Sequence, residues 1–216
     1  MAPTRTSRIE DGRNLPLLFW RFAEPARAIC SGPLGGGVGD RQWIINATVS
    51  REYSRMDPDR HLAELADGLG LRGPGAGLLT AVDVGAVEFA NDGGVEVAAT
   101  VGLGHPTWAA APDGDLRHGI GTINIVGWVP VALTDAALVN AALTVTEAKV
   151  QALWEYGLEA TGTASDAVVV ACPAAGPAEP FGGPRSTWGA RLARATHQAV
   201  LAGTAAWPPA WGHPFE

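Results

Sequence analysis

One order of predicted elements occurs twice along the chain. In each half, a strand rich in bulky and β-branched residues contains an Ile-Asn step, Ile45-Asn46 in the first half and Ile123-Asn124 in the second. A helix follows each strand, from Asp57-Pro58 to about Gly70 and from Asp135 to Tyr156, and a glycine-containing turn then leads into another strand. The repetition predicts an internal strand-helix-strand duplication.

The remaining predicted elements are mostly strands, of which the first two are short apolar segments at Pro16–Phe22 and Ala26–Ile29. Gly77–Phe89 and Val95–Val101 read as two strands separated by the segment 91–94, whose sequence Asn-Asp-Gly-Gly is typical of a hairpin turn with positive φ. A final helix is expected at Thr187–Leu201. Strands outnumber helices, and hairpin and crossover links are mixed. This predicts an α+β fold, with mixed β-sheet packed against about three helices.

Length and composition indicate one domain. The chain has 216 residues, of which 47% are apolar and 17% charged, enough for one well-buried core and short for two. We expect a disordered N-terminus over residues 1–14 and a single domain over residues 15–204. The Trp- and Pro-rich tail, residues 205–216, either packs over the domain or serves as an interaction segment.

Charge and motif content exclude several classes of function. With 15 basic against 22 acidic residues, a net charge of −7 argues against nucleic acid as a partner. Residues 1–13 have no apolar core of a signal peptide, and no apolar run is long enough for a membrane span, so we expect a cytoplasmic protein that does not bind membranes. Cys30, Cys172 and the histidines show no metal-ligand spacing, and neither an ATP nor an NAD motif is complete, so no metal and no cofactor are expected.

The predicted helix Asp135–Tyr156 combines a polar stripe with one misplaced charge. At 100° per residue, Glu147 falls in one stripe with Asn140, Thr144 and Gln151, whereas Lys149 falls within the apolar arc. Lys149 either extends its ammonium to water or has a buried partner. The functional interpretation is a buried helix in which Glu147 and Lys149 face a site.

Two short polar segments are further candidates. Thr161–Asp166 supplies hydroxyls, a glycine and a carboxylate at the mouth of a strand, and is either a ligand-facing loop or an ordinary turn. In Gly119–Asn124, Asn124 is a structural amide or a group that hydrogen-bonds substrate. His105 and His118 flank the loop before this strand and are either solvated or proton shuttles.

Several of these segments, in this order, resemble the adenosylcobinamide amidohydrolase family. The resemblance runs from about residue 26 to residue 200, and each piece is unspecific alone. It departs from the family at Ser165, where the family tends to have Thr, and in the loop Thr100–His105. The matching pieces are Gly35–Gly37, Asn46, Tyr53, Gly77–Ala81, Gly121–Asn124, Thr146–Lys149, Thr161–Thr163 and Asp166–Val168.

The resemblance implies hydrolysis of the amide between a corrin-ring propionate and aminopropanol or its phosphate, giving adenosylcobyric acid for cobalamin salvage. From the needs of amide hydrolysis, we assign Glu147 as general base, Lys149 or Asn124 as oxyanion donor, and Asp166 with Thr163 or Ser165 as positioning groups. We expect the substrate to be contacted by Gly36, Gly37, Asn46, Thr80, His105, Thr122, Asn124, Thr163 and Ser165.

Three other functions stay open at this point. The alternatives are an amidohydrolase of the same fold that acts on another small amide, a non-catalytic corrinoid-binding protein, and a structural interaction module. The expected partner is a corrinoid small molecule, and the tryptophans make a homo-oligomer a further expectation.

Overall fold

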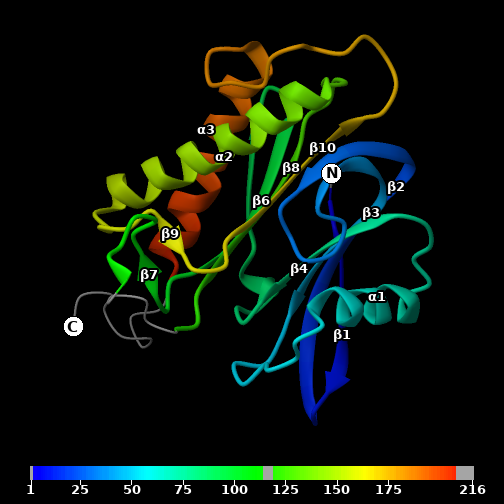
Figure 1. The fold of residues 1–216 in the computed structure, drawn as a ribbon, viewed down its shortest axis with the longest axis vertical. Coiled ribbons are helices and arrows are strands. Elements are labelled where there is room, and N and C mark those ends of the chain that lie inside the picture. Colours follow the sequence, from blue (N-terminus) through cyan, green and yellow to red (C-terminus); the bar gives the residue numbers. More distant parts are fainter. Residues whose placement is uncertain (1, 114–118, 208–216) are drawn as a thin grey trace.

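The computed structural model describes residues 2–113 and 119–207. One eight-stranded mixed sheet forms the centre of the molecule, with a separate two-stranded β7-β9 ribbon (Figure 1). The α+β prediction is confirmed. The elements are β1 (Thr4–Glu10), β2 (Arg13–Cys30), β3 (Gly37–Thr48), α1 (Pro58–Gly68), β4 (Gly75–Thr80), the 3-10 helix η1 (Val84–Ala86), β5 (Glu88–Asp92), β6 (Val95–Gly102), β7 (Pro106–Thr107), β8 (Thr122–Trp128), α2 (Asp135–Tyr156), β9 (Gly162–Thr163), β10 (Ala167–Pro173) and α3 (Thr187–Ala205).

The sheet consists of two units with the same topology. In the first unit the neighbouring strands are β4-β3-β2-β1, and in the second they are β10-β8-β6-β5. Each unit begins with an antiparallel hairpin and ends with a parallel pair, β3 with β4 and β8 with β10, joined through a helix. Antiparallel pairing of β2 with β10 unites them. The duplication predicted from the two Ile-Asn steps is therefore present in the fold.

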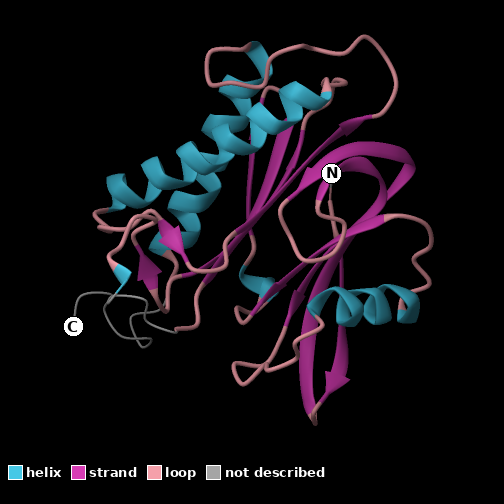
Figure 2. Cartoon of the chain, viewed as in Figure 1, coloured by secondary structure: helices cyan, strands magenta, loops and turns pink. Residues whose placement is uncertain are grey.

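The helices cover the two units from opposite sides, as Figures 1 and 2 show. One apolar cluster lies between the second unit and α2 with α3, and another lies between the first unit and α1. A third cluster gathers side chains from the inner face of both units, including Trp20, Ile44, Leu78, Val126 and Val169. The sheet curves around this inner cluster, because burial of one face from both units requires them to face each other.

Helix α2 has the bounds that the sequence predicts. The Thr134 side chain accepts a hydrogen bond from the backbone N–H of Ala137, and Gly157 ends the helix with φ of 94°. Leu138, Val145 and Leu153 are fully buried against the sheet. These caps fix the first and last residues of the helix.

The expectation of disorder over residues 1–14 is wrong. Thr4–Glu10 pairs antiparallel with residues 13–19, and the two strands are joined at Asp11-Gly12, both with positive φ. An Asp-Gly pair between two strands is a strong hairpin signal. The polar composition of β1 reflects an edge strand that exposes alternate side chains rather than a segment without structure.

Two strand boundaries also differ from prediction. The two short strands expected at Pro16–Phe22 and Ala26–Ile29 belong to β2, which continues through a register shift between Arg21 and Ala26. The strand expected at Gly77–Phe89 stops at Thr80, because the Thr80 hydroxyl accepts a hydrogen bond from the Val82 N–H and turns the chain.

The C-terminal prediction is only partly within the structure. Helix α3 runs on to Ala205, beyond the predicted Leu201, while residues 208–216 of the expected tail lie outside the described residues. Within the described ranges, no helix combines the length and hydropathy needed to cross a bilayer.

Candidate active site

Asp166 is the centre of a hydrogen-bond cluster at the start of β10. Its Oδ1 accepts from the Ile123 N–H at 2.8 Å and from the Thr163 hydroxyl at 2.6 Å. Its Oδ2 accepts from the Thr163 N–H at 3.1 Å and from Lys149 Nζ at 2.5 Å. Four donors fill the lone-pair positions of a carboxylate, so Asp166 joins α2, β9 and the start of β8 and has no acceptor position left for a water.

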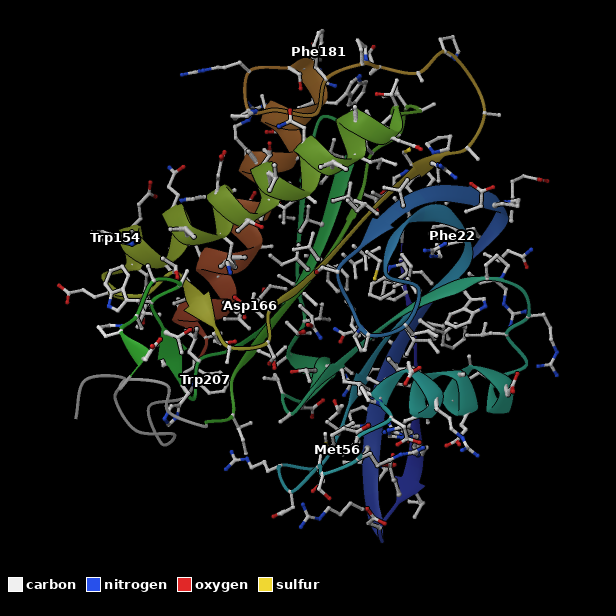
Figure 3. The ribbon with its side chains drawn as sticks, in the orientation of Figure 1. Phe22, Met56, Trp154, Asp166, Phe181 and Trp207 are labelled. Atoms are coloured by element: carbon white, nitrogen blue, oxygen red, sulfur yellow. The ribbon has the colours of Figure 1, made fainter. Side chains whose placement is uncertain are left out.

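Lys149 reaches this cluster from the buried side of α2. The residue is only 7% exposed, and its ammonium forms an ion pair with Asp166. Of the two alternatives drawn from the helix pattern, the buried partner is the observed one. Gly162 makes the approach possible: a Cβ at this position, where φ is 156°, would lie 2.2 Å from Asp166 Oδ2 and 2.4 Å from Lys149 Nζ. In Figure 3, Asp166 lies beside β9 and below α2.

A chain of hydroxyl groups begins next to Asp166. Ser165 Oγ donates to the Gly121 carbonyl at 2.9 Å and lies 2.8 Å from Thr122 Oγ1. Because a serine hydroxyl has one proton, Thr122 must be the donor to Ser165. The direction Thr122 to Ser165 to Gly121 leaves the acceptor lone pairs of Thr122 Oγ1 available to a molecule in front of it.

These hydroxyls line a cavity of about 330 Å³ between the two units. Thr122, Ser165 and Ala167 come from the second unit, and Thr80 and Tyr53 come from the first. Thr80 Oγ1 accepts from the Val82 N–H, and its own proton has no acceptor in the described part of the chain. The two units therefore contribute a hydroxyl donor, at Thr80, and a hydroxyl acceptor, at Thr122, to the lining of the cavity.

A buried network of side-chain amides is centred on Asn124, which follows Thr122 by two residues in β8. Asn124 Nδ2 donates to Asn46 Oδ1 at 2.9 Å and to the Leu79 carbonyl at 3.0 Å, and Asn46 Nδ2 donates to Thr100 Oγ1 at 3.1 Å. Asn124 Oδ1 is buried and accepts no hydrogen bond from the described residues. Both amide protons of Asn124 are engaged, so its side chain holds the two units together beside Leu79, which lines the cavity.

Glu147 does not join this arrangement. It is exposed on α2, whereas Thr144, Val145, Ala148 and Lys149 are buried. The expectation that both Glu147 and Lys149 lie out of water is therefore wrong for Glu147. A helix that is apolar over most of its circumference does not reveal from its pattern which side faces the sheet.

The glycine loop before β3 is also separate from the cavity, whose lining includes Pro33 but not Gly36 or Gly37. The loop is bound instead to β4 and β3, because the Gly77 N–H donates to the Leu34 carbonyl at 3.0 Å and Arg41 donates to the Gly35 carbonyl at 2.6 Å. The two short polar segments singled out in the sequence, Gly119–Asn124 and Thr161–Asp166, do come together, through the bonds of Ser165 to Thr122 and of Asp166 to Ile123.

His105 lies behind the cavity wall. Its ring packs against Gly119, where an added Cβ would come within 1.9 Å of it. Gly119 lines the cavity but His105 does not. His118 lies outside the described residues.

A second series of polar side chains, to which the sequence pattern assigned no role, reaches this cavity through Tyr53. Tyr53 Oη lies 3.1 Å from His61 Nδ1, and His61 Nε2 lies 3.4 Å from Glu10 Oε2. Burial lowers the pKa of His61, and burial also raises the pKa of the Tyr53 phenol. The Tyr53 and His61 rings stack with centroids 5.5 Å apart. The Asp11-Gly12 hairpin signal, which places Glu10 in a strand, is the sequence feature that would have brought Glu10 near α1.

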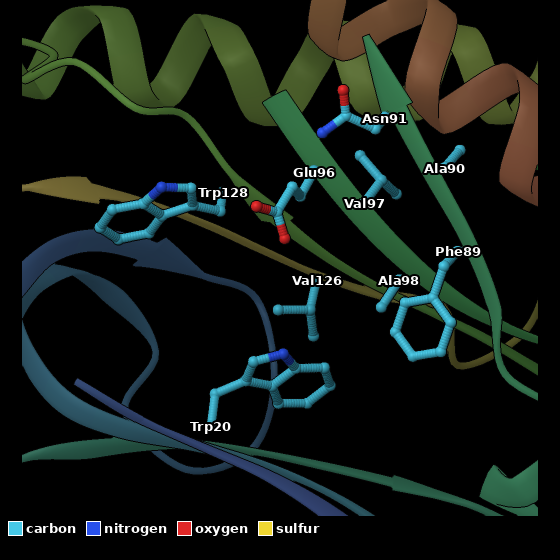
Figure 4. Close-up of a pocket in the computed structure, with 9 residues that line it drawn as sticks. All are labelled: Trp20, Phe89, Ala90, Asn91, Glu96, Val97, Ala98, Val126 and Trp128. Carbon is cyan, nitrogen blue, oxygen red and sulfur yellow. The ribbon is translucent and has the colours of Figure 1, made fainter. Parts of the chain in front are cut away.

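Another concavity lies at the opposite end of the inner face (Figure 4). Its walls are aromatic and aliphatic side chains, with Asn91 and Glu96 as the polar members. It contains no hydroxyl cluster, so the cavity at Thr122 is the better candidate for hydrolytic chemistry. Across the described residues, no group of three His, Cys, Asp or Glu side chains is arranged to hold a metal ion.

Comparison with known proteins shows the family of the chain. The family model described as "Adenosylcobinamide amidohydrolase" matches residues 2–210. A protein of that name from Methanosarcina mazei is 31% identical over 185 residues, covering 82% of this chain and 88% of its own. Another, from Halobacterium salinarum, is 34% identical over 189 residues, covering 83% and 80%. The chain belongs to the adenosylcobinamide amidohydrolase family.

A solved structure, of the PH0078 protein from Pyrococcus horikoshii OT3, is 12% identical and covers 88% of this chain and 75% of its own, with a TM-score of 0.44. That similarity is too low to support an inference.

Proposed function

We propose that this protein hydrolyses the secondary amide that joins a corrin-ring propionate to aminopropanol, or to its phosphate, in adenosylcobinamide-type corrinoids. The products are the free amine and adenosylcobyric acid, which re-enters cobalamin assembly. The observation that carries the proposal is the cavity that Thr80 of the first unit and Thr122 of the second unit both line, with Thr122 bonded to Ser165 next to the Asp166 cluster. Membership in the family supports the substrate class.

The size of the cavity suits the side arm and not the whole ring. About 330 Å³ accommodates a propionamide with its aminopropanol, whereas a corrin macrocycle needs much more room. The ring then stays outside, and the amide carbonyl enters between the two units. This arrangement explains how a small cavity serves a large substrate.

The hydroxyl groups supply the contacts that the reaction needs. The Thr80 hydroxyl, whose proton has no acceptor among the described residues, donates to the amide oxygen and stabilises the charge that develops there. The attacking water donates to Thr122 Oγ1, which Ser165 holds in orientation. The water oxygen forms a bond to the carbonyl carbon, the C–N bond breaks, and the amine leaves with an added proton.

Asp166 and Lys149 act as positioning residues in this proposal. Asp166 holds the Ile123 N–H and both donors of Thr163, which fixes the strand ends that carry Thr122 and Ser165. Lys149 neutralises the carboxylate from behind. Asn124 has no free amide proton for an oxyanion, so we assign it to the same supporting role.

Incubating the purified protein with adenosylcobinamide tests the proposal. Mass spectrometry is expected to find adenosylcobyric acid and aminopropanol in equal amounts. Thr122→Val and Thr80→Val, which keep the side-chain shape, are expected to slow release about 100-fold. Tight binding of the corrinoid without release would support a carrier protein, and release from other small amides only would indicate a different substrate.

Glu147→Gln separates this proposal from the assignment made on sequence alone. Glu147 is exposed on α2, so the variant is expected to turn over at the wild-type rate. A loss of about 100-fold in the folded variant would restore Glu147 as general base.

We further propose that hydrolysis needs no metal, because hydroxyl groups and a carboxylate supply the contacts described above. Protein dialysed against a chelator is expected to keep its activity.

Two buried free thiols, Cys30 and Cys172, support a cytoplasmic location, which cell fractionation tests. The exposed edge-to-face pair Trp108 and Trp154 supports self-association, which light scattering tests.

A further inference from the structure

We propose that Tyr53, backed by His61 and Glu10, is the catalytic residue that takes the proton from the attacking water. This inference rests on the proposed amide hydrolysis and adds a route for the proton to it. Tyr53 lines the same cavity as Thr80, Thr122 and Ser165. The groups behind Tyr53 come from separate elements, His61 from α1 and Glu10 from β1.

The hydrogen-bond partners fix the direction of the chain. An ionised Glu10 carboxylate only accepts, so the neutral His61 ring carries its proton on Nε2, which faces Glu10 Oε2 at 3.4 Å. Nδ1 is then an acceptor, and the Tyr53 hydroxyl, 3.1 Å away, donates its proton to it. The phenol oxygen keeps its lone pairs and is available as an acceptor in the cavity.

The proton balance follows from this direction. As the water oxygen bonds to the carbonyl carbon, its proton passes to Tyr53 Oη, and the phenol proton passes to His61 Nδ1. The imidazolium is stabilised by Glu10. The proton returns by the same path to the amine nitrogen as the C–N bond breaks. One water is consumed, and His61 and Tyr53 regain their starting states.

Charges from each packed element surround His61. Burial is the largest influence and lowers its pKa, Glu10 opposes this, and Arg8 and Arg55 add to it. His61 is therefore neutral near pH 7 and able to accept a proton. The Tyr53 phenol, whose pKa is raised by burial and affected in opposite directions by Arg55 and Asp57, stays protonated. A proton acceptor behind the phenol is needed for it to serve as a base.

The alternative is that these three residues only attach β1 to α1. In that case their substitution lowers stability without changing the pH dependence of catalysis. Arg8 also binds Glu10 and the Thr48 carbonyl, so β1 has other attachments beside His61. A conservative change in the trio is consequently expected to leave the fold in place.

The test is steady-state hydrolysis of adenosylcobinamide across a range of pH. Tyr53→Phe is expected to lower kcat at least 100-fold with KM changed less than about threefold. Tyr156→Phe, at an exposed tyrosine on α2, is the matched control and is expected to retain wild-type kcat. His61→Gln is expected to lower kcat as Tyr53→Phe does, whereas His197→Gln on α3 is not.

Glu10→Gln separates the relay from a purely structural role, because a structural role would leave the pH dependence of catalysis unchanged. Because Glu10 raises the pKa of His61, its neutralisation is expected to shift the acid limb of kcat/KM to lower pH. Wild-type kcat in Tyr53→Phe, or an unshifted limb in Glu10→Gln, would overturn the relay while leaving the proposed function intact. No amine release by the wild-type protein would instead overturn the function itself.

Should the variants fail to fold, the wild-type protein still decides the matter. An imidazole pKa falls on warming, whereas a carboxyl pKa hardly moves. The acid limb of the wild-type profile is therefore expected to move to lower pH as temperature rises. A limb that stays in place excludes His61 as the titrating group.

Discussion

The side-chain amide of Asn124 donates to the side-chain oxygen of Asn46 at 2.9 Å, so corresponding residues of the two structural units touch. Each asparagine follows an isoleucine in the strand that precedes its helix. Both are buried, Asn124 at 1% exposure and Asn46 at 2%. The contact joins the two units two residues along β8 from Thr122, which lines the cavity.

Replacing Asn124 tests the importance of that contact. Asn124→Ala leaves Asn46 Oδ1 and the Leu79 carbonyl without their donor in a buried place. We expect the free energy of unfolding to fall by about 2 to 3 kcal/mol, measured by urea denaturation. Asn91→Ala, at an exposed position on β5, is the control and is expected to change it by less than about 0.5 kcal/mol. Equal effects at the two positions would contradict the role of the network.

The ion pair between Lys149 and Asp166 gives a second prediction. Lys149→Met leaves a mostly buried carboxylate without its countercharge, and we expect a loss of about 3 kcal/mol in unfolding free energy. Arg72→Met breaks the solvent-exposed pair with Asp67 and is expected to cost less than about 1 kcal/mol. A Lys149→Met protein as stable as Arg72→Met would show that the buried pair is dispensable.

Gly162 is predicted to tolerate no side chain. Gly162→Ala places a methyl group against Asp166 Oδ2 and Lys149 Nζ, so the pair must separate. Gly176→Ala is the control, because φ there is also positive, at 112°, but no atom lies within 4 Å of the added Cβ. Both variants carry backbone strain, and we expect Gly162→Ala to lose a further 1 to 3 kcal/mol, roughly, from overpacking. Thermal denaturation compares them, and equal melting temperatures would refute the prediction.

His61 predicts a pH dependence of stability. Its pKa is lower in the folded protein than the ordinary value of 6.5, so the unfolded chain binds more protons. Stability is then lost as pH falls below about 6.5 toward the folded-state pKa. Urea denaturation of wild type and His61→Gln between pH 7.5 and 5 measures this, and the variant is expected to lose less stability over that range. Parallel curves would show that His61 does not titrate on unfolding.

The parts of the fold that follow local rules could be predicted from the sequence. Helix α2 begins at a Thr cap and ends at a glycine with positive φ, and both residues are recognisable without a structure. The hairpin at residues 91–94 is of the same kind, with positive φ at Gly93 and Gly94. The N-terminal hairpin obeys the same rule at Asp11-Gly12, but its polar strand resembles a disordered segment.

The site was less predictable because its contacts are tertiary. The helix pattern left two alternatives for Lys149, an ammonium extended to water or a buried partner, and it did not single out Asp166 among the acidic residues as that partner. For Glu147 the same pattern was misleading, since the side of α2 that faces the sheet depends on the packing of β10 and α3. Tyr53 lies in the loop before α1, His61 on α1 and Glu10 on β1, and their contact depends on how β1 lies beside α1.

The position of β2 in the sheet has a consequence for synthesis on the ribosome. β2 pairs along one edge with β3, which follows at once. On its other edge, residues 13–19 pair with β1, and residues 26–30 pair with β10, whose residues 167–173 emerge much later. Residues 26–30 must therefore wait with that edge unpaired while more than half of the polypeptide is translated, and an open strand edge invites pairing with other chains. The nascent first unit is thus the stage at which this protein is most in need of a chaperone.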